Sequence, residues 1–263
     1  MADPLVARFL AHLAYRGRSP ATIRRRRITL GQLARHLPLD EATTDGLEQF
    51  LGVWTSAATR RAYRADLRDF YRWAASRGHI AHDPAAGLAA ISEPVTEPRP
   101  LPATVLAELL ATPEPVTRRM IWVAAYAGLR VSEIAALEAS DIDPVAATLR
   151  VAVGKGGHGR TVRLVPELAA ELEQVGSGRL FPGASGASVS ARIKRRMVQI
   201  GVPGAHPHQL RHSFATRAAR ALNGDVVAVA ALLGHRSFAT TRRYVTLWQP
   251  DAEQLRGLYG DAA

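Results

Sequence analysis

A proline-rich segment near the middle of the chain constrains the fold more than any other feature of the sequence. Four prolines lie between Ile91 and Pro102, in the stretch ISEPVTEPRPLP. Prolines remove backbone hydrogen-bond donors and favour extended chain, so no regular helix is expected to cross this stretch. We therefore expect a linker over residues 91–101 between two domains, over residues 1–90 and 102–263. The length of 263 residues is enough for two hydrophobic cores.

The first domain is expected to be helical, with helices over about residues 4–16, 20–36, 41–52 and 56–77. Ser19 before Pro20 is typical of a helix N-cap followed by proline at the first helical position, and Gly78 fits a helix end. The apolar positions of the fourth helix recur with the 3.6-residue period and are expected to face the core: Tyr63, Leu67, Phe70, Tyr71 and Ala74.

The chain is strongly basic, with 34 Lys and Arg against 23 Asp and Glu, a net charge of +11. The excess is present in both halves, with 15 Arg against 10 acids in residues 1–99 and 19 bases against 13 acids in residues 100–263. This balance indicates a polyanionic partner that faces both domains, most simply nucleic acid. The absence of cysteine excludes disulfides, thiolate nucleophiles and Cys-ligated zinc. We expect neither a membrane span nor a signal peptide, and a cytoplasmic location.

Arginines of the first domain form a one-sign stripe beside the predicted apolar face of the fourth helix, next to a run of four arginines in the second. A solvated helix face is the alternative interpretation, but the charge of the chain favours contacts with DNA phosphates. The candidate DNA-binding residues of this domain are Arg24, Arg25, Arg26, Arg27, Arg61, Arg64, Arg68 and Arg72.

The second domain is expected to combine helices with one β-hairpin. The segments TLRVAV and RTVRLV read as strands on either side of the glycine-rich turn GKGGHG. Helices are expected over about residues 102–111, 116–127, 166–175, 188–200, 208–221, 225–233 and 238–244, with a further one near Arg130 and a short tail helix at about 252–258. The predicted fold class is mainly α with a small β-hairpin or sheet (α+β).

Two segments in the first half of this domain carry side chains suited to chemistry. Arg130 and Glu133, in AGLRVSEIAAL, are three residues apart and share a helix face; an ordinary surface ion pair is the alternative. Lys155 lies in GKGGHGR, where glycines permit close approach to a ligand; an exposed turn lysine is the alternative. With 32 arginines and only two lysines in the chain, Lys155 stands out as able to give up a proton. His158 and Arg160, beside it, are further DNA-binding candidates.

Two more segments lie closer to the C-terminus. HPHQLRHSFATRAAR places His208, Arg211 and His212 on one face at the start of a helix, which is a ready phosphate site. Metal binding by these histidines is a weaker alternative, because no neighbouring Asp, Glu or Cys completes a ligand set. In LLGHRSFATTRRYV, His235 follows a glycine helix end and Tyr244 lies nine residues later. Alone, Tyr244 would more often be a half-buried core tyrosine.

Taken in order, these segments resemble the catalytic signature of the tyrosine recombinases, the lambda-integrase and Xer family. That signature is Arg, an acidic residue three later, a hairpin Lys, His-x-x-Arg, a His or Trp, and Tyr nine beyond it. The matching positions are Arg130, Glu133, Lys155, His208, Arg211, His235 and Tyr244. The resemblance covers about residues 100–250, and the helices of residues 1–90 look like the family's core-type DNA-binding domain. The segment between Lys155 and His208 is short for the family, so part of its small sheet is expected to be trimmed.

The resemblance implies a site-specific recombinase that needs no metal, cofactor or ATP. Tyr244 would attack the scissile phosphate and form a 3′-phosphotyrosine, on the way to a Holliday junction. The other implied roles are that Arg130 and Arg211 hold the non-bridging oxygens, His208 accepts the tyrosine proton or holds the phosphate, His235 donates a hydrogen bond to it, Lys155 protonates the leaving oxygen, and Glu133 orients Arg130 or His208.

The resemblance also implies an assembly. Both domains would form a C-shaped clamp around double-stranded DNA at inverted core sites. A homotetramer would form there, with the tail helix within residues 251–263 docked into the next protomer; docking of the tail on its own domain is the alternative.

Integration of a phage or mobile element is our leading interpretation of the biological role. Xer-like resolution of chromosome or plasmid dimers is the alternative, and a non-catalytic DNA-binding regulator or a topoisomerase is less favoured.

Overall fold

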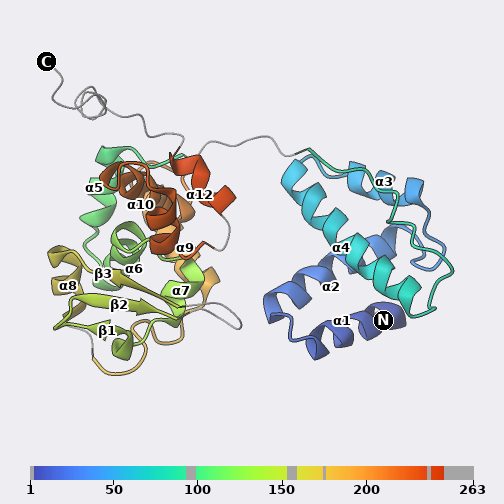
Figure 1. Ribbon diagram of the computed structural model, residues 1–263, viewed down its shortest axis with the longest axis horizontal. Helices are drawn as coiled ribbons and strands as arrows, with labels where there is room; N and C mark the ends of the chain where they lie inside the picture. The colour runs from blue at the N-terminus through green and yellow to red at the C-terminus, as the bar shows by residue number, and fades with distance from the viewer. Residues whose placement is uncertain (1–2, 93–98, 153–158, 174–175, 236–237, 246–263) are drawn as a thin grey trace, which may run out of the picture. The chain divides into compact units, whose positions relative to one another are not determined.

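The computed structural model describes residues 3–92, 99–152, 159–173, 176–235 and 238–245. The chain divides into two compact units, Met1–Val95 and Thr96–Ala263, coloured blue to teal and green to red in Figure 1. The described residues are mainly helical, with a small antiparallel sheet in the second unit, so the predicted fold class is confirmed. The predicted linker falls largely outside the described residues, and the DNA clamp stays a prediction.

The N-terminal unit is built from helices whose starts are capped by side chains. Its helices are α1 (Pro4–Tyr15), α2 (Pro20–His36), α3 (Thr44–Gly52) and α4 (Ala57–Ser76). Ser19 and Ser56 accept hydrogen bonds from backbone N–H groups of α2 and α4, at the positions where the sequence indicates helix starts. The third helix begins at Thr44, later than the predicted start near residue 41, and the Thr43 side chain accepts a hydrogen bond from the backbone N–H of Gly46.

The core of this unit is rich in aromatic side chains. Leu67, Phe70 and Tyr71 of α4 are fully buried, as their spacing predicts, whereas Tyr63 is only partly buried at the edge of the core. Phe9 of α1 meets Phe70 edge to face, with ring centroids 5.3 Å apart. The 3.6-residue periodicity of α4 therefore identifies the face that holds this unit together.

The C-terminal unit contains the remaining described elements. These are α5 (Ala103–Leu110), α6 (Pro115–Tyr126), α7 (Val131–Ala136), the 3-10 helix η1 (Ala139–Asp141), β1 (Ile142–Asp143), β2 (Thr148–Val151), β3 (Arg160–Arg163), α8 (Pro166–Glu173), α9 (Gly186–Gln199), α10 (His208–Ala221), α11 (Val226–Leu233) and α12 (Phe238–Val245). The sheet is antiparallel in the order β1-β2-β3, with Leu149 opposite Val162. The predicted hairpin corresponds to β2 and β3, and the two-residue strand β1 was not predicted.

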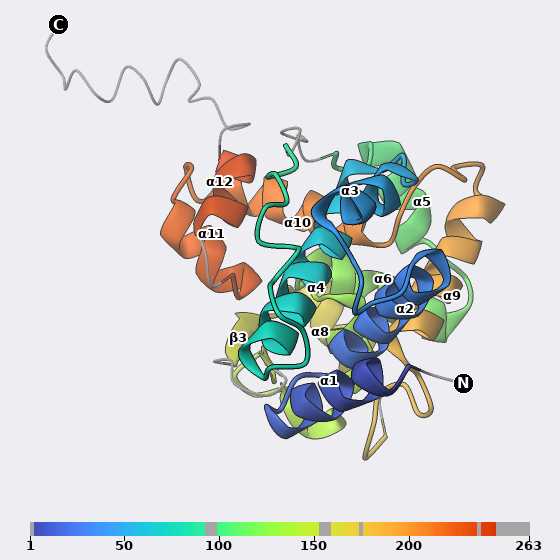
Figure 2. The same cartoon turned by 90° about the vertical axis from the view of Figure 1, so that its right-hand side faces the viewer.

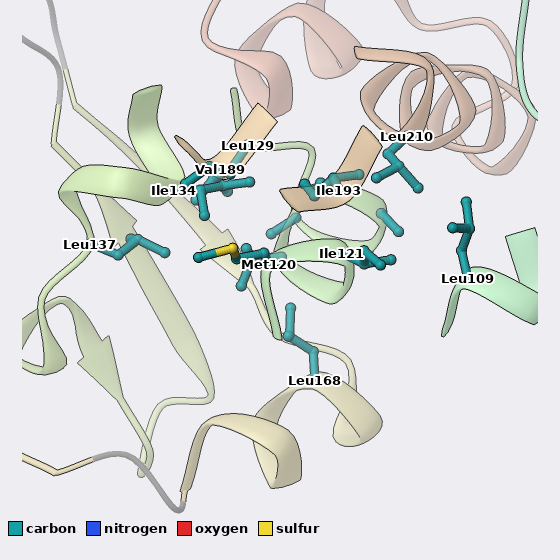
Figure 3. Close-up of a cluster of buried hydrophobic side chains, with 14 of the residues drawn as sticks. Leu109, Met120, Ile121, Leu129, Ile134, Leu137, Leu168, Val189, Ile193 and Leu210 are labelled. Carbon is teal, nitrogen blue, oxygen red and sulfur yellow. The ribbon is translucent and has the colours of Figure 1, made fainter. Parts of the chain in front are cut away.

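Helix α6 lies at the centre of the main core of this unit. Figure 3 shows Met120 and Ile121 of α6 among apolar side chains of its neighbours, including Ile134 of α7 and Ile193 of α9. The labelled side chains are buried. This core packs α7 against α9 and includes Leu149 and Val162 of the sheet.

A smaller apolar cluster joins α10, α11 and α12, which lie together in Figure 2. It comprises Ala215, Ala219, Val229, Leu233 and Tyr244. Tyr244 is 3% exposed, so its ring is part of this packing. The packing of these three helices against one another therefore decides where the tyrosine hydroxyl lies.

Two glycines permit close approaches at the ends of helices in this unit. Gly128, before α7, has φ +65°, and a Cβ there would lie 2.4 Å from a ring atom of Phe214. Gly234 ends α11 with φ +61°, and a Cβ there would meet the Arg160 guanidinium at 3.0 Å. Both positions favour glycine for conformation and for space. They bring the ends of α6 and α11 against residues of α10 and β3.

Candidate active site

The site begins where the chain enters α7. Arg130 precedes the helix, and its backbone N–H donates to Glu133 Oε2 at 2.8 Å. The Arg130 side chain also donates to Glu133 Oε1, at 2.7 Å. The two side chains form an ion pair, but Arg130 is in extended backbone before the helix and so does not share a helix face with Glu133 as predicted. Because 40% of the Arg130 side chain remains exposed, its guanidinium can also reach a ligand.

Arg160 of β3 completes the surroundings of this carboxylate. Its guanidinium donates to both oxygens of Glu133, at 3.1 and 2.9 Å, and its side chain is 6% exposed. Arg160 is a DNA-binding candidate by sequence, but these contacts place it in the protein interior. The physical reason is that a two-pronged guanidinium satisfies a carboxylate inside the fold better than any other side chain.

The charge of Glu133 is stabilised strongly. Burial alone would raise its pKa, but hydrogen bonds and positive charge from Arg160 and Arg130 outweigh burial and lower the pKa of Glu133 to about 2. The carboxylate is therefore ionised at any physiological pH. Its acceptor positions are occupied by arginine donors, which suits it to holding arginines rather than to moving protons.

Arg211 of α10 is buried next to this pair, with 2% of its side chain exposed. It donates to the backbone carbonyls of Gly128 and, at 2.6 Å, Leu233, and it lies 3.9 Å from Glu133. Burial and the neighbouring charge of Arg130 lower the pKa of Arg211 to about 10, which still leaves it protonated at neutral pH. Arg211 thus ties the end of α6, the end of α11 and Glu133 together around one fixed positive charge.

His235, after α11, contacts this guanidinium. The Arg211 Nη2 lies 3.1 Å from His235 Nε2, and His235 Nδ1 lies 2.8 Å from the hydroxyl of Thr241 in α12. Because a guanidinium can only donate, Nε2 accepts and the ring proton lies on Nδ1. Donation from Nε2 to a phosphate, the role that the resemblance implies, therefore requires that this nitrogen first gain a proton.

Tyr244 of α12 contacts a histidine that the set of seven positions does not include. Its hydroxyl lies 2.6 Å from Nδ1 of His212. His208, one helical turn earlier in α10, meets the His212 ring edge to face, with centroids 4.5 Å apart. The sequence placed both histidines on one helix face but gave the proton-accepting role to His208 alone. The spacing of four residues was the signal that could have included His212.

Three of the predicted features fall outside the described residues: Lys155, His158 and the tail of residues 251–263. In the described part of the chain, no group of three His, Asp or Glu side chains could hold a metal ion together. Nor does any helix there combine the length and the apolar character needed to cross a membrane.

Some of the predicted DNA-binding arginines of the N-terminal unit are engaged within the fold. Arg25 donates to Asp66 at 2.7 Å, while Arg26 lies 3.4 Å from Asp66 and also pairs with Asp69. Arg64 donates to the carbonyl of Leu88, at 3.2 and 2.6 Å. The exposed members of the predicted set are Arg24, Arg25, Arg27 and Arg72. The stripe therefore mixes residues that stabilise the unit with residues that face solvent.

Comparison with known proteins identifies the family. The model of the phage integrase family matches residues 100–249. A tyrosine recombinase XerC from Rhodospirillum centenum is 37% identical, over 98% of this chain and 78% of the relative. A second XerC, from Chromobacterium violaceum, is 32% identical, over 99% and 94%. The chain belongs to the phage integrase family of tyrosine recombinases, and it is a site-specific tyrosine recombinase.

Solved structures agree on the fold. A lambda integrase dimer bound to a core site superposes with a TM-score of 0.72 at 22% identity, covering 90% of this chain and 95% of that one. A lambda integrase tetramer bound to a Holliday junction gives a TM-score of 0.72 at 23% identity, covering 94% and 78%. The family resemblance that the sequence indicated is confirmed.

Proposed function

We propose that the chain cuts and rejoins double-stranded DNA through Tyr244, which attacks the scissile phosphate and forms a 3′-phosphotyrosine. The observation that carries this proposal is the convergence of α7, α10, α11 and α12. Arg211 lies 3.9 Å from Glu133 and 3.1 Å from His235, and the next residue, His212, contacts the Tyr244 hydroxyl. Phosphoryl transfer needs a nucleophile beside fixed positive charge, and this arrangement supplies both.

The contacts distribute the proposed roles. Arg130, partly exposed, would bind a non-bridging oxygen directly. The buried charge of Arg211 would stabilise the pentacoordinate phosphate, while Glu133 holds both arginines in place. Lys155 would protonate the leaving 5′ oxygen, because a lysine can give up a proton and an arginine cannot. Rejoining reverses the same steps, so no external energy source enters.

For the biological role, we propose Xer-like resolution of chromosome or plasmid dimers in preference to integration of a mobile element. Integration was the leading interpretation of the sequence, but two relatives that match 98% and 99% of the chain bear the name XerC.

We further propose that the chain acts as a homotetramer on inverted core sites. Each chain would hold the DNA as a clamp of its two units, and its tail would dock into the next chain of the tetramer. The dimeric and tetrameric lambda integrase complexes with DNA support this by analogy of fold.

The central test is Tyr244→Phe. It should abolish the SDS-stable protein–DNA adduct and leave DNA affinity nearly unchanged, because affinity comes mainly from arginine contacts with phosphates. Tyr126→Phe, at a partly buried tyrosine beside Arg217 in the same unit, is the matched control and should keep adduct formation. An adduct that persists in Tyr244→Phe would show that another residue is the nucleophile. If the wild-type protein forms no adduct, the result would favour a non-catalytic DNA-binding regulator.

The biological role can be tested by mapping the DNA to which the wild-type protein becomes covalently attached. Genomic DNA of the host is fragmented, incubated with the protein, and the adducts are sequenced. Adducts at a site of the chromosome or of a plasmid, away from element ends, would support dimer resolution. Adducts at the junctions of a mobile element would support integration instead.

A further inference from the structure

The hydroxyl of Tyr244 is in contact with a potential base. His212 Nδ1 lies 2.6 Å from Tyr244 Oη, a distance typical of a short hydrogen bond. The ring centroids are 5.6 Å apart, so the rings lean toward each other at the polar ends. With only 3% of Tyr244 exposed, bulk water has little access to the hydroxyl. A proton that leaves this oxygen must therefore pass to a protein group or to DNA.

We propose that His212 is a catalytic residue that accepts the phenolic proton of Tyr244 during DNA cleavage. The proposal rests on the proposed role of Tyr244 as nucleophile. It assigns His208 to the second of its two predicted roles, holding the phosphate. In this role the ring proton of His212 lies on Nε2, so that Nδ1 accepts from the hydroxyl.

Helix α10 explains why two neighbouring residues act on different partners. Arg211 points into the unit and is fully buried, whereas His212 is partly buried and meets α12. His208, one turn earlier, lies on the same face as His212 and is exposed. The His208 ring stands edge-on against the His212 ring. One helix thus presents a fixed cation to the site centre and two histidines toward the tyrosine side.

The step balances as follows. The Tyr244 O–H bond breaks and its proton moves to His212 Nδ1, while a bond forms between Tyr244 Oη and phosphorus. The bond from phosphorus to the 5′ oxygen breaks, and that oxygen takes a proton from the proposed acid, Lys155. In religation the 5′ hydroxyl attacks phosphorus and returns its proton to Lys155, the bond from phosphorus to Tyr244 Oη breaks, and His212 gives its proton back to the phenolate. A base is useful because free tyrosine has a pKa of about 10 and is almost wholly protonated at neutral pH.

The first experiment measures single-turnover adduct formation by His212→Gln and His212→Ala, with His206→Ala as the matched control. His206 is exposed just before α10, and the control should keep the wild-type rate. Both His212 variants should form adduct about 100-fold more slowly or worse, the range lost with a general base. A wild-type rate in either variant would overturn the proposal. Glutamine retains a hydrogen bond to the hydroxyl, so it also serves if the alanine variant fails to fold.

The second experiment separates proton acceptance from positioning. Tyr244 is replaced by tetrafluorotyrosine, whose phenol is far more acidic, in the wild-type and His212→Gln backgrounds. If His212 accepts the proton, the rate loss caused by His212→Gln should shrink at least tenfold with the fluorinated residue. An unchanged loss would assign His212 a positioning role and overturn the proposal. If Tyr244→Phe still forms adduct, the proposed function itself fails, which is a different result.

A substrate with sulfur in place of the leaving 5′ oxygen provides the remaining check. A thiolate leaves without protonation, so the defect of a Lys155→Ala variant should be rescued. The defect of His212→Gln should persist, because the tyrosine proton must still be removed. Rescue of His212→Gln by sulfur would place His212 on the leaving group and contradict the proposal.

Discussion

Each unit of the molecule holds a carboxylate that is at most 12% exposed beside two arginines, Asp66 in the N-terminal unit and Glu133 in the C-terminal unit, and the pKa values of these two acids shift in opposite directions. In the N-terminal unit, burial raises the pKa of Asp66, although Arg25 and Arg26 lie nearby. In the C-terminal unit, hydrogen bonds and charge outweigh burial and lower the pKa of Glu133 to about 2. The number of positive neighbours therefore does not decide the ionisation of a buried acid.

The difference lies in the hydrogen bonds. Glu133 accepts from the backbone and side chain of Arg130 and from two nitrogens of Arg160. Asp66 accepts from Arg25 at 2.7 Å and Thr29 at 3.0 Å, and the nearer Arg26 nitrogen is 3.4 Å away. Exposure of the arginines does not separate the two sites, since Arg25 is 46% exposed and Arg130 is 40% exposed. A carboxylate whose hydrogen bonds are saturated is a rigid anchor for arginines, whereas a buried carboxylate with fewer hydrogen bonds carries a cost of burial.

The largest effect is expected for Arg160, which holds the Glu133 carboxylate with two hydrogen bonds. Arg160→Ala leaves the buried carboxylate of Glu133 without its two-pronged partner, which should destabilise the C-terminal unit by about 3–5 kcal/mol. Arg160→Lys keeps the charge without the fork and should fall between alanine and wild type. Thermal and urea unfolding of the three proteins measure this. A loss below about 1 kcal/mol for alanine would mean that the anchor contributes little.

Glu133→Gln should be nearly as severe and should carry a pH signature. The folded pKa of about 2 lies below the ordinary 4.5, so ionisation contributes stability above pH 4.5 that is lost as pH falls toward 2. The shift corresponds to roughly 3 kcal/mol at neutral pH. The stability difference between wild type and Glu133→Gln should therefore shrink between pH 4.5 and 2, which urea unfolding across that range would reveal. A difference independent of pH would contradict the comparison.

A smaller effect separates paired from exposed arginines in the N-terminal unit. Arg72→Gln, at an exposed position of α4, should weaken DNA binding several-fold and reduce the slope of log affinity against log salt by about 0.9. Arg26→Gln, which loses contacts to Asp66 and Asp69, should lower the melting temperature and change the slope little. Salt titrations of binding and thermal unfolding read the two effects independently. Equal slopes for Arg72→Gln and wild type would remove Arg72 from the DNA-binding set.

The smallest effect is expected for Asp66→Asn. A folded pKa above the ordinary 3.8 means that Asp66 favours folding below pH 3.8 and loses this contribution as pH rises through the folded value. At neutral pH the asparagine removes the cost of a buried charge along with the ion pair with Arg25. The net change should stay within about 1 kcal/mol. A loss comparable to that of Glu133→Gln would show that the two carboxylates are equivalent anchors.

Much of the fold was predictable because local signals decide it. Helix starts follow from caps such as Ser19 and Ser56, and the core face of α4 follows from its periodicity. Strand β1 was not predictable, since two residues carry no period. The motif predicted the helix near Arg130, but it did not predict that Arg160 of β3 binds Glu133 of this helix.

The sequence named Arg130, Glu133, Arg211 and His235, which the structure places close together, but it did not predict their contacts. An arginine in a basic chain looks the same whether it faces DNA or a carboxylate 27 residues away, as Arg160 faces Glu133. The contact of His212 with Tyr244 depends on how α10 packs against α12, which no local pattern encodes. Sequence motifs thus identify residues whose chemistry fits, and packing decides which of them meet.

The glycine at the end of α11 has a consequence for how mutations spread through this unit. Gly234 lies against the Arg160 side chain of β3 and directly precedes His235, so a side chain there would press on the guanidinium that holds Glu133. The end of α11 is therefore tightly packed against Arg160 of β3. We expect a substitution at position 234 to be tolerated only when Arg160 shifts with it, so position 234 should vary little as the rest of the chain diverges.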